Sequence, residues 1–271
     1  MQRHRGSIKH CYNWRVGATS FVVPADMMFN VRLLADMVDN VQLLFFESHE
    51  NSSLEHPVDI PGLSQVAREH DLTYTVHLPS DLHLGATDFN QRQHAIDQIV
   101  RLVTELDCLA PKCYDLHLLQ ENGLSDSKWL DNLDASLNKL SCKMGSAGRL
   151  IGIENLDYQF DPVASLASRH GFSVSLDIGH ALRFQHGWEY LMKYVLNAAH
   201  IHYHGVVEGK DHLALPAAQD RITKQLGMKL EKVDFNGVVT LEVYSLDFLK
   251  ESIGVIERVW ALSSGLNRDK F

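Results

Sequence analysis

The sequence lacks the features that mark membrane, secreted and nucleotide-binding proteins. Its longest apolar runs, such as residues 41–46, are far shorter than the roughly 20 residues that a transmembrane helix needs. The basic residues near its start are not followed by an apolar stretch, so they do not form a secretory signal. Neither a Gly-rich phosphate loop nor a GxSxG turn occurs. We therefore expect a soluble cytoplasmic protein that does not contact a membrane.

Cysteine and positive charge are also scarce. The cysteines lie far apart without CxxC spacing, at Cys11, Cys108, Cys113 and Cys142, which predicts free thiols in a reducing compartment. Lys and Arg number 25 against 34 Asp and Glu, so the formal net charge is −9. A field of that sign repels nucleic acid unless one face is locally basic. Hydrophobic residues make up 45% of the chain and charged residues 22%, a balance typical of a globular protein.

Eight short apolar runs alternate with longer amphipathic segments along the chain. Runs rich in Val, Ile and Leu that are apolar on both faces suit a parallel sheet covered on both sides. These runs are Arg15–Thr19, Val41–Phe46, Thr73–His77, Cys113–Leu118, Leu150–Glu154, Ser173–Asp177, His200–Tyr203 and Val238–Glu242. Eight strand–helix units predict a single α/β domain, a (β/α)8 TIM barrel over residues 15–262, between an N-terminal extension (1–14) and a C-terminal tail (263–271). A doubly wound open sheet is the alternative, but it normally carries a Gly-rich turn after its first strand.

The amphipathic segments predict the helices that follow these strands. Asn30 and Asp126 precede two of them as candidate N-caps, and Asp161-Pro162 offers a cap followed by Pro at the first helical position. Gly171 is placed as a helix stop signal. The predicted helices cover residues 31–37, 62–70, 91–106, 127–143, 162–170, 187–195, 217–229 and 247–259.

Seven of the eight predicted strands end on His, Asp or Glu, although the chain's 16 histidines alone would prove little. In a TIM barrel the C-terminal ends of the strands meet at one mouth, where catalytic groups project. Clustered carboxylates repel unless a cation lies among them, and a mixed set of Glu, Asp and His suits Zn²⁺ or Mn²⁺. We therefore expect a divalent metal site at this mouth. The strand-end residues that meet there are Glu47, His77, His117, Glu154, Asp177 with His180, His202 with His204, and Glu242. Asp211 and His212, in a loop after the seventh strand, lie within reach of the same mouth.

This order of ligands resembles the xylose isomerase-like TIM-barrel superfamily, which includes sugar isomerases and epimerases and the abasic-site nucleases of AP endonuclease family 2. The resemblance covers about residues 16–260 and is most specific in the segments GIENLD, SLDIGH, HIHYHG and TLEVYS. The epimerases hold one metal on their last four strands, which the resemblance places on Glu154, Asp177, His202 and Glu242. The nucleases add further ligands, which would be His77, His117, His180, Asp211 and His212. The last two are adjacent here, whereas the nucleases have Asp-x-His, so a third metal is left open.

A closer resemblance is carried by the segments VGATSFVVPADMMFNVRLLADMVDNVQLLFFES, LTYTVHLPSDLHLG and GKDHLAL. They are similar to the cobamide-remodelling phosphodiesterases called CbiR, which hydrolyse the phosphodiester of the lower-ligand nucleotide and release a cobinamide phosphate. This resemblance implies a metal-dependent hydrolase with a corrinoid as its small-molecule partner and no nucleic acid. It implies Glu154, Glu242 and His180 as catalytic residues. Substrate contacts are expected from Glu47, His204, Phe160 and Tyr244.

Two other functions stay open on the sequence. A sugar or sugar-phosphate isomerase or epimerase would use one metal, with Glu154 and Glu242 as acid and base on either side of a carbon. It would not need the additional histidines, which favour the hydrolase. A non-catalytic corrinoid- or sugar-binding module would leave seven sets of strand-end ligands without a role. The sequence indicates no protein partner.

Overall fold

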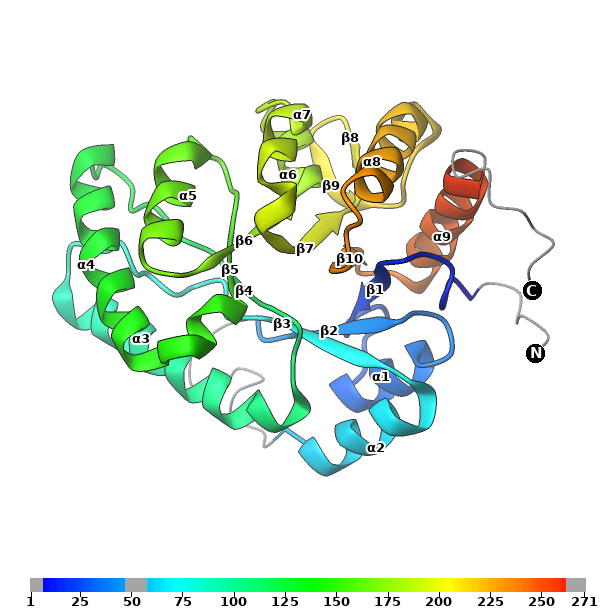
Figure 1. Ribbon diagram of the computed structural model, residues 1–271, viewed down its shortest axis with the longest axis horizontal. Coiled ribbons are helices and arrows are strands. Elements are labelled where there is room, and N and C mark those ends of the chain that lie inside the picture. The colour runs from blue at the N-terminus through cyan, green and yellow to red at the C-terminus, as the bar shows by residue number, and fades with distance from the viewer. Residues whose placement is uncertain (1–6, 47–57, 262–271) are drawn as a thin grey trace.

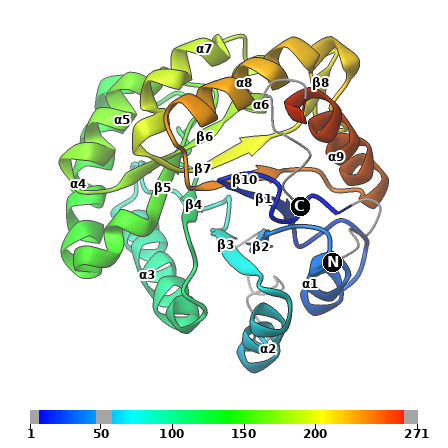
Figure 2. The ribbon, with the colours of Figure 1, turned by 45° about the vertical axis from the view of Figure 1, so that its right-hand side comes forward.

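The computed structural model describes residues 7–46 and 58–261. Eight parallel strands form a closed barrel in the spatial order β1-β10-β7-β6-β5-β4-β3-β2, with helices around it, which confirms the predicted single TIM barrel (Figures 1 and 2). The barrel strands are β1 (Arg15–Thr19), β2 (Asn40–Leu44), β3 (Thr73–His77), β4 (Tyr114–Leu116), β5 (Ile151–Glu154), β6 (Ser173–Asp177), β7 (Ala198–Tyr203) and β10 (Val238–Leu241). No helix in these two ranges is both long and apolar enough to cross a membrane.

The helices lie outside the barrel (Figure 2). They are α1 (Met27–Leu34), α2 (Ile60–His70), α3 (Phe89–Leu106), α4 (Asp126–Met144), α5 (Phe160–Arg169), α6 (Ile178–Arg183), α7 (Trp188–Leu191), α8 (Asp220–Lys232) and α9 (Leu246–Ala261). All eight predicted helical segments contain helix, and Gly171 follows α5 with φ +79°, as a stop signal does.

The predicted N-caps are wrong in three cases. Asp26 caps α1, whereas Asn30 lies inside that helix and its side-chain oxygen accepts hydrogen bonds from the backbone N–H groups of Val22 and Val23. Ser125, one residue before Asp126, caps α4. Helix α5 begins at Phe160, so that Asp161 lies within its first turn. In each case the helix begins at an earlier residue than predicted. Residue type alone does not reveal the exact position of a helix N-terminus.

Two elements near the barrel mouth were not predicted from the sequence. Helix α6 starts directly after β6, because the Asp177 side chain accepts the backbone N–H of His180 and serves as its N-cap. Strands β8 (Gly205–Val207) and β9 (Lys210–Leu213) form an antiparallel hairpin where a loop was expected. The two residues between them, Glu208 and Gly209, both have positive φ, as a tight hairpin turn requires. Glutamate is an unusual residue for that conformation, so the turn has a weak sequence signal.

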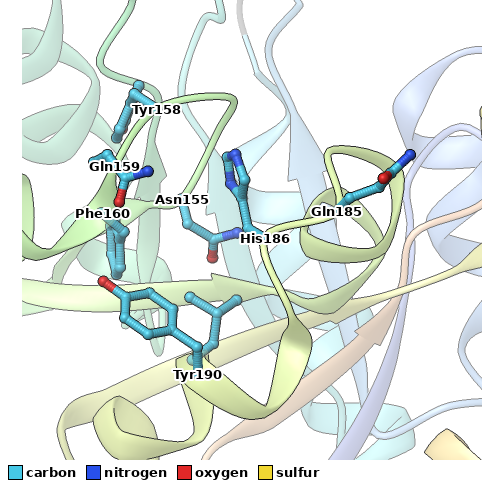
Figure 3. Close-up of a pocket in the computed structure, with 8 residues that line it drawn as sticks. Asn155, Tyr158, Gln159, Phe160, Gln185, His186 and Tyr190 are labelled. Carbon is cyan, nitrogen blue, oxygen red and sulfur yellow. The ribbon is translucent and has the colours of Figure 1, made fainter.

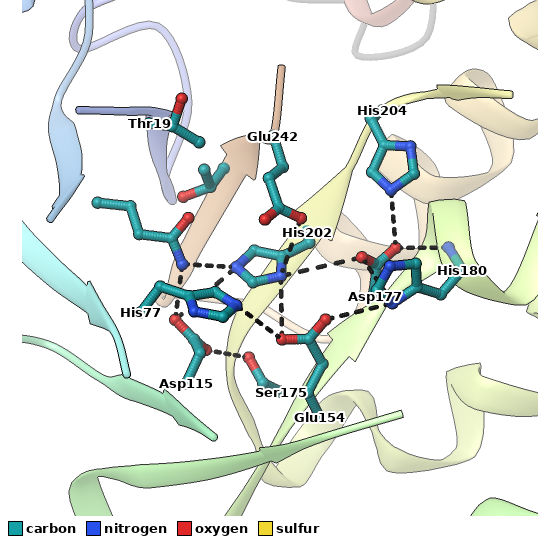
Figure 4. A network of polar contacts seen from close by, with 12 residues as sticks. Thr19, His77, Asp115, Glu154, Ser175, Asp177, His180, His202, His204 and Glu242 are labelled. Atoms are coloured by element: carbon teal, nitrogen blue, oxygen red, sulfur yellow. Dashed lines mark hydrogen bonds and ion pairs between the residues drawn. The ribbon is translucent and has the colours of Figure 1, made fainter. Parts of the chain in front are cut away.

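Each barrel strand has an apolar outer face and a polar inner face, which corrects the expectation that the strands are apolar on both faces. In β5, Ile153 packs in the hydrophobic core and Glu154 points to the barrel axis (Figure 4). Inner-face polar residues line up across neighbouring strands, as in the pairs Asp177↔His202 and His202↔Thr240. Many TIM barrels fill this space with branched aliphatic side chains. Here polar side chains fill it, and some of them are hydrogen-bonded to one another, as His200 is to the Thr240 hydroxyl.

The part of the predicted N-terminal extension that the structure describes packs on the barrel. Ile8 and Trp14 are buried, and Trp14 makes an edge contact with Trp260 of α9 at a ring-centroid distance of 5.3 Å. Residues 7–14 therefore contribute to the core. The predicted C-terminal tail, 263–271, lies outside the described residues.

Candidate metal centre

Glu154 lies at the middle of a cluster of histidines and carboxylates at the C-terminal ends of the strands (Figure 4). Its Oε2 lies 3.3 Å from His117 Nε2, 3.9 Å from His77 Nε2 and 3.4 Å from His202 Nδ1. Its Oε1 lies 3.4 Å from His180 Nδ1. Oε2 thus faces His77, His117 and His202, and Oε1 faces His180. Glu154 therefore lies between the histidines at the ends of β3 and β4 and the residues of the last four strands.

The last four barrel strands supply the second group. His202 Nδ1 lies 3.4 Å from Glu242 Oε2 and 4.0 Å from Asp177 Oδ2. His180 Nδ1 lies 3.2 Å from Asp177 Oδ2. All these side chains are at least nine-tenths buried, because they come from the inner faces of adjacent strands or, for His180, from the first turn of α6.

The spacing of these atoms fits coordination of a metal better than direct hydrogen bonding. Charge-assisted N–H···O bonds are about 2.7–2.9 Å long. Two ligand atoms at about 2.0–2.2 Å from a tetrahedral ion are separated by about 3.3–3.6 Å. Most contacts in the cluster fall between 3.2 and 3.4 Å, including the distance between His77 Nε2 and His117 Nε2. The distances between these ligand atoms thus match those between neighbouring ligands of a coordinated metal ion.

The hydrogen-bond accounting supports the same conclusion. Among the described residues, ten buried side-chain N or O atoms have no hydrogen-bond partner, and seven of them belong to this cluster. They are both oxygens of Glu154, Asp177 Oδ2, His180 Nδ1, His202 Nδ1, His204 Nε2 and Glu242 Oε2. Leaving one such atom unsatisfied costs about 1–3 kcal/mol. Seven in one place are expected where a cation completes the site.

In two histidines at the edge of the cluster, a backbone carbonyl determines which ring nitrogen carries the proton. His77 Nδ1 lies 2.8 Å from the Leu78 carbonyl oxygen, and His212 Nδ1 lies 3.1 Å from that of Glu242. Donation of Nδ1–H to a carbonyl leaves the Nε2 lone pair free, as in many metal-bound histidines. His212 has a left-handed backbone, with φ 52°, a conformation uncommon outside glycine.

The buried charges shift each other's protonation. Burial alone would raise the pKa of Glu154, but the neighbouring His202 and His117 outweigh it and hold this pKa well below its ordinary value. Burial would lower the pKa of His180, yet the Asp177 carboxylate and Glu154 raise it to about 10. The proton that His180 keeps offsets the charge of these carboxylates. A divalent ion would replace this proton and release it.

A layer of polar residues under the cluster was not anticipated from the sequence. Asp115 of β4 accepts hydrogen bonds from Gln42 Nε2 (2.9 Å), from the Ser175 hydroxyl and from His200 Nδ1 (2.7 Å). Gln42 Nε2 also lies 2.8 Å from His202 Nε2. Asp115 precedes His117 by two residues and His200 precedes His202 by two, so a period-2 search of each strand would have found both.

The remaining predicted site residues occupy different positions around the mouth. Asp211 forms an ion pair with Arg183 of α6, and it belongs to none of the candidate ligand groups among the described residues. His212 lies with His180 and His204 in one such group. Tyr244, 40% exposed, donates from its hydroxyl to Glu242 Oε1 at 3.2 Å. Glu47 lies outside the described residues.

The cluster opens into a cavity of about 180 Å³. His77, His117, His180, His212 and Glu242 face it from the ligand cluster, and Leu44, Phe45, Phe46, Ser80 and Tyr244 complete the lining. Phe46 is 44% exposed and meets Phe21 edge to face, so aromatic rings form one rim of the mouth. His204, predicted as a substrate contact, has no exposed surface and is not part of this lining.

A second cavity, of about 290 Å³, lies between the β5–α5 connection and the α6–α7 region (Figure 3). Its lining includes Asn155, Phe160, Gln185, His186 and Tyr190 and contains neutral amides and aromatic rings but no carboxylate. Phe160, predicted as a substrate contact, faces this cavity and not the first. The Asn155 amide bonds both the N–H and the C=O of Asp177, so the wall of the cavity is tied to the ligand cluster.

Comparisons with known proteins agree on the fold. No protein-family model matches the chain, and no curated protein matches it in sequence. A D-tagatose 3-epimerase-like protein superposes with a TM-score of 0.76 at 18% identity, covering 93% of this chain and 98% of its own. The IOLI protein with a bound zinc atom gives a TM-score of 0.72 at 13% identity, covering 92% and 99%. An AP endonuclease of family 2 from Brucella melitensis gives 0.66 at 16% identity, covering 88% and 96%. At these identities the similarity establishes that the chain has the TIM-barrel fold of these enzymes.

Proposed function

We propose that this chain is a divalent-metal-dependent phosphodiesterase acting on a small molecule, with the nucleotide-loop phosphodiester of a cobamide as its substrate. The observation that carries the proposal is the pair of histidines, His77 and His117, beside Glu154. His77 and His117 face each other across 3.2 Å beside Glu154 Oε2, in addition to the set from the last four strands. An epimerase that uses one ion needs only the ligands from the last four strands and does not need His77 and His117.

The residues fit two ion sites that share Glu154. His77, His117 and Glu154 would hold one ion. Glu154, Asp177 and Glu242, each with an oxygen 3.4–4.0 Å from His202 Nδ1, would hold another together with His202. Bound ions of this kind supply charge stabilisation to a phosphodiester and lower the pKa of a coordinated water. Zn²⁺ or Mn²⁺ matches the mixed nitrogen and oxygen ligands.

The chain's own residues would bind and orient the substrate. His180 and His212 line the cavity, and in this proposal they would contact the phosphodiester oxygens. Tyr244 keeps its proton: although the side chain is partly exposed, desolvation of its hydroxyl and the nearby Glu242 raise its pKa, so the hydroxyl remains a donor that orients Glu242. Hydrolysis adds water across the P–O bond to the lower-ligand nucleoside, which leaves as an alcohol, and the phosphate stays on the corrinoid.

The surroundings of the centre suit a substrate larger than a hexose. The aromatic rim of Phe21, Phe46 and Tyr244 offers an apolar surface at one side of the mouth. The second cavity offers neutral amide and hydroxyl groups, which suit uncharged hydrogen-bonding substituents. The formal charge of −9 disfavours DNA as the substrate.

A sugar epimerase or isomerase is the second candidate. Its specific support is the TM-score of 0.76 with the D-tagatose 3-epimerase-like protein. In that reaction Glu154 and Glu242 would exchange a proton with carbon, and His77 and His117 would only line the pocket.

One experiment separates the two functions. Protein loaded with Zn²⁺ or Mn²⁺ is incubated with adenosylcobalamin and, separately, with a panel of ketohexoses and their phosphates, and products are identified by mass spectrometry. We expect cobinamide phosphate and the free lower-ligand nucleoside from the cobamide. Interconversion of ketohexoses with the cobamide left intact would overturn the phosphodiesterase in favour of the epimerase. The Glu154→Gln variant serves as the control for both assays.

A further inference from the structure

The imidazole of His204 is held in one position behind the ligand cluster. It is fully buried, and its ring lies 4.3 Å from the ring of His212, centroid to centroid. On its other side, a Cβ added at Gly179 would lie 2.0 Å from the His204 ring carbon Cε1. Only glycine at position 179 leaves room for this ring. Gly179 and His204 thus form a matched pair.

The hairpin fixes which nitrogen of His204 carries its proton. The backbone N–H of His212 on β9 donates to His204 Nδ1 at 3.0 Å. A nitrogen that accepts a hydrogen bond carries a lone pair, so the proton of the neutral ring is on Nε2. Nε2 has no formed hydrogen bond in the structure and faces Asp177 Oδ1 at 3.3 Å (Figure 4).

The two oxygens of Asp177 have different surroundings. Oδ1 accepts the backbone N–H of His180 at 2.7 Å and faces His204 Nε2. Oδ2 has no hydrogen-bond partner and lies 3.2 Å from His180 Nδ1 and 4.0 Å from His202 Nδ1. The carboxylate is therefore oriented through one oxygen while the other faces the ligand atoms.

We propose that His204 is a positioning residue that donates from Nε2–H to Asp177 and so directs Asp177 Oδ2 toward the metal, without binding an ion itself. The hairpin of β8 and β9 holds His204 in the required tautomer. This inference rests on the metal centre proposed above but on no particular substrate. It assigns a role to a histidine that could otherwise be counted as a ligand, either together with His180 and His212 or together with Asp177 and Glu242.

The test compares His204→Gln with His204→Met by metal affinity and stoichiometry. The amide of Gln can replace the Nε2–H donor, whereas Met fills similar space without one. Loss of an outer contact to a ligand typically costs on the order of 10–100-fold in metal affinity. We expect that loss in His204→Met, a much smaller one in His204→Gln, and unchanged stoichiometry in both. Isothermal titration with Zn²⁺ against a competing chelator measures affinity, and elemental analysis measures stoichiometry.

Two further measurements keep the proposal testable if a buried variant folds poorly. Gly179→Ala displaces the His204 ring without removing it, so it should weaken Zn²⁺ binding at unchanged stoichiometry. Long-range ¹H–¹⁵N correlation spectra of the unsubstituted protein should show His204 protonated on Nε2. His94→Gln, on the exposed side of α3, is the matched control and should leave Zn²⁺ binding unchanged.

Each contrary result has a distinct meaning. Loss of one bound ion in both His204 variants would make His204 a ligand and overturn the inference, as would a proton on Nδ1. Unchanged affinity in His204→Met would also overturn it. Failure of the unsubstituted protein to bind any divalent ion would instead overturn the metal centre and the proposed function with it.

Discussion

The two faces of the barrel strands differ in the chemistry of the side chains that they bury. Ile153 and Glu154 are neighbours in β5 and are both fully buried. Ile153 belongs to the apolar core between barrel and helices, whereas Glu154 meets three histidines around the barrel axis within 3.4 Å. The two side chains are thus equally buried but have different surroundings, apolar for Ile153 and polar for Glu154. Apolar packing stabilises the outer face, and the inner face stays polar because it holds the candidate metal centre.

The comparison indicates how stability and activity are divided. Substitutions on the outer face should lower the free energy of unfolding and leave metal binding intact. Substitutions on the inner face should remove metal or turnover and leave the fold intact. The layer around Asp115 lies between these cases, because it is polar yet Asp115 itself accepts hydrogen bonds from Gln42, Ser175 and His200.

The largest effect is expected from Glu154→Gln. This change removes the charge that both groups of ligand atoms share, so turnover should fall by on the order of 10³ or more, about 4 kcal/mol of transition-state stabilisation. Asp177→Asn should behave similarly. Circular dichroism should remain that of a folded barrel while elemental analysis shows reduced metal content. Normal turnover at normal metal content in either variant would exclude that residue as a ligand.

Ile153→Ala is the matched substitution one residue away. Truncation of a buried Ile leaves a cavity and costs about 2–5 kcal/mol of unfolding free energy. Urea unfolding measures this loss, and metal affinity at a temperature where the variant is folded should match that of the unsubstituted protein. A large loss of metal affinity without loss of stability would contradict the division between the two faces.

His117→Ala tests the ligand atoms that distinguish a hydrolase from an epimerase. If His77 and His117 hold an ion, kcat on the cobamide should fall by on the order of 10², or ~3 kcal/mol. KM should change less, because the lost charge acts mainly in the transition state. Steady-state kinetics on the cobamide and on ketohexoses decide the matter. Ketohexose turnover that survives the substitution would favour the one-metal epimerase.

The smallest effect concerns Asp115 and acid stability. Burial alone would raise its pKa, but His200 and its hydrogen bond lower the pKa to about 2 from 3.8. A carboxyl group whose pKa is lower in the folded state stabilises the protein above its unfolded pKa. That stabilisation, about 2 kcal/mol, is lost as the pH falls from about 4 toward 2. Urea unfolding at pH 6 and at pH 2.5 should show a smaller pH-dependent difference for Asp115→Asn than for the unsubstituted protein. Equal differences would show that Asp115 does not contribute in this way.

Much of the fold follows from local sequence patterns. The strand segments of the barrel and the helices between them are each specified by nearby apolar spacing, and all eight strands were located within a few residues. The sequence located Glu154, Asp177, His202 and Glu242 at the mouth because one residue's place in a strand fixes its place at the mouth; their role as ligands stays a prediction. The hairpin of β8 and β9 and the true N-caps were missed, because they depend on backbone conformations with weak residue preferences.

The sequence by itself determined the barrel, the mouth and the chemical types gathered there, since the periodicity of a strand is local. Only the tertiary structure decided which of those side chains meet. Asp211 and His212 are adjacent in sequence, yet one pairs with Arg183 and the other turns to the ligand cluster. Gly179 and His204 are far apart in the chain and fit each other within van der Waals contact. Such pairings depend on closure of the barrel, which brings together residues that no local pattern relates.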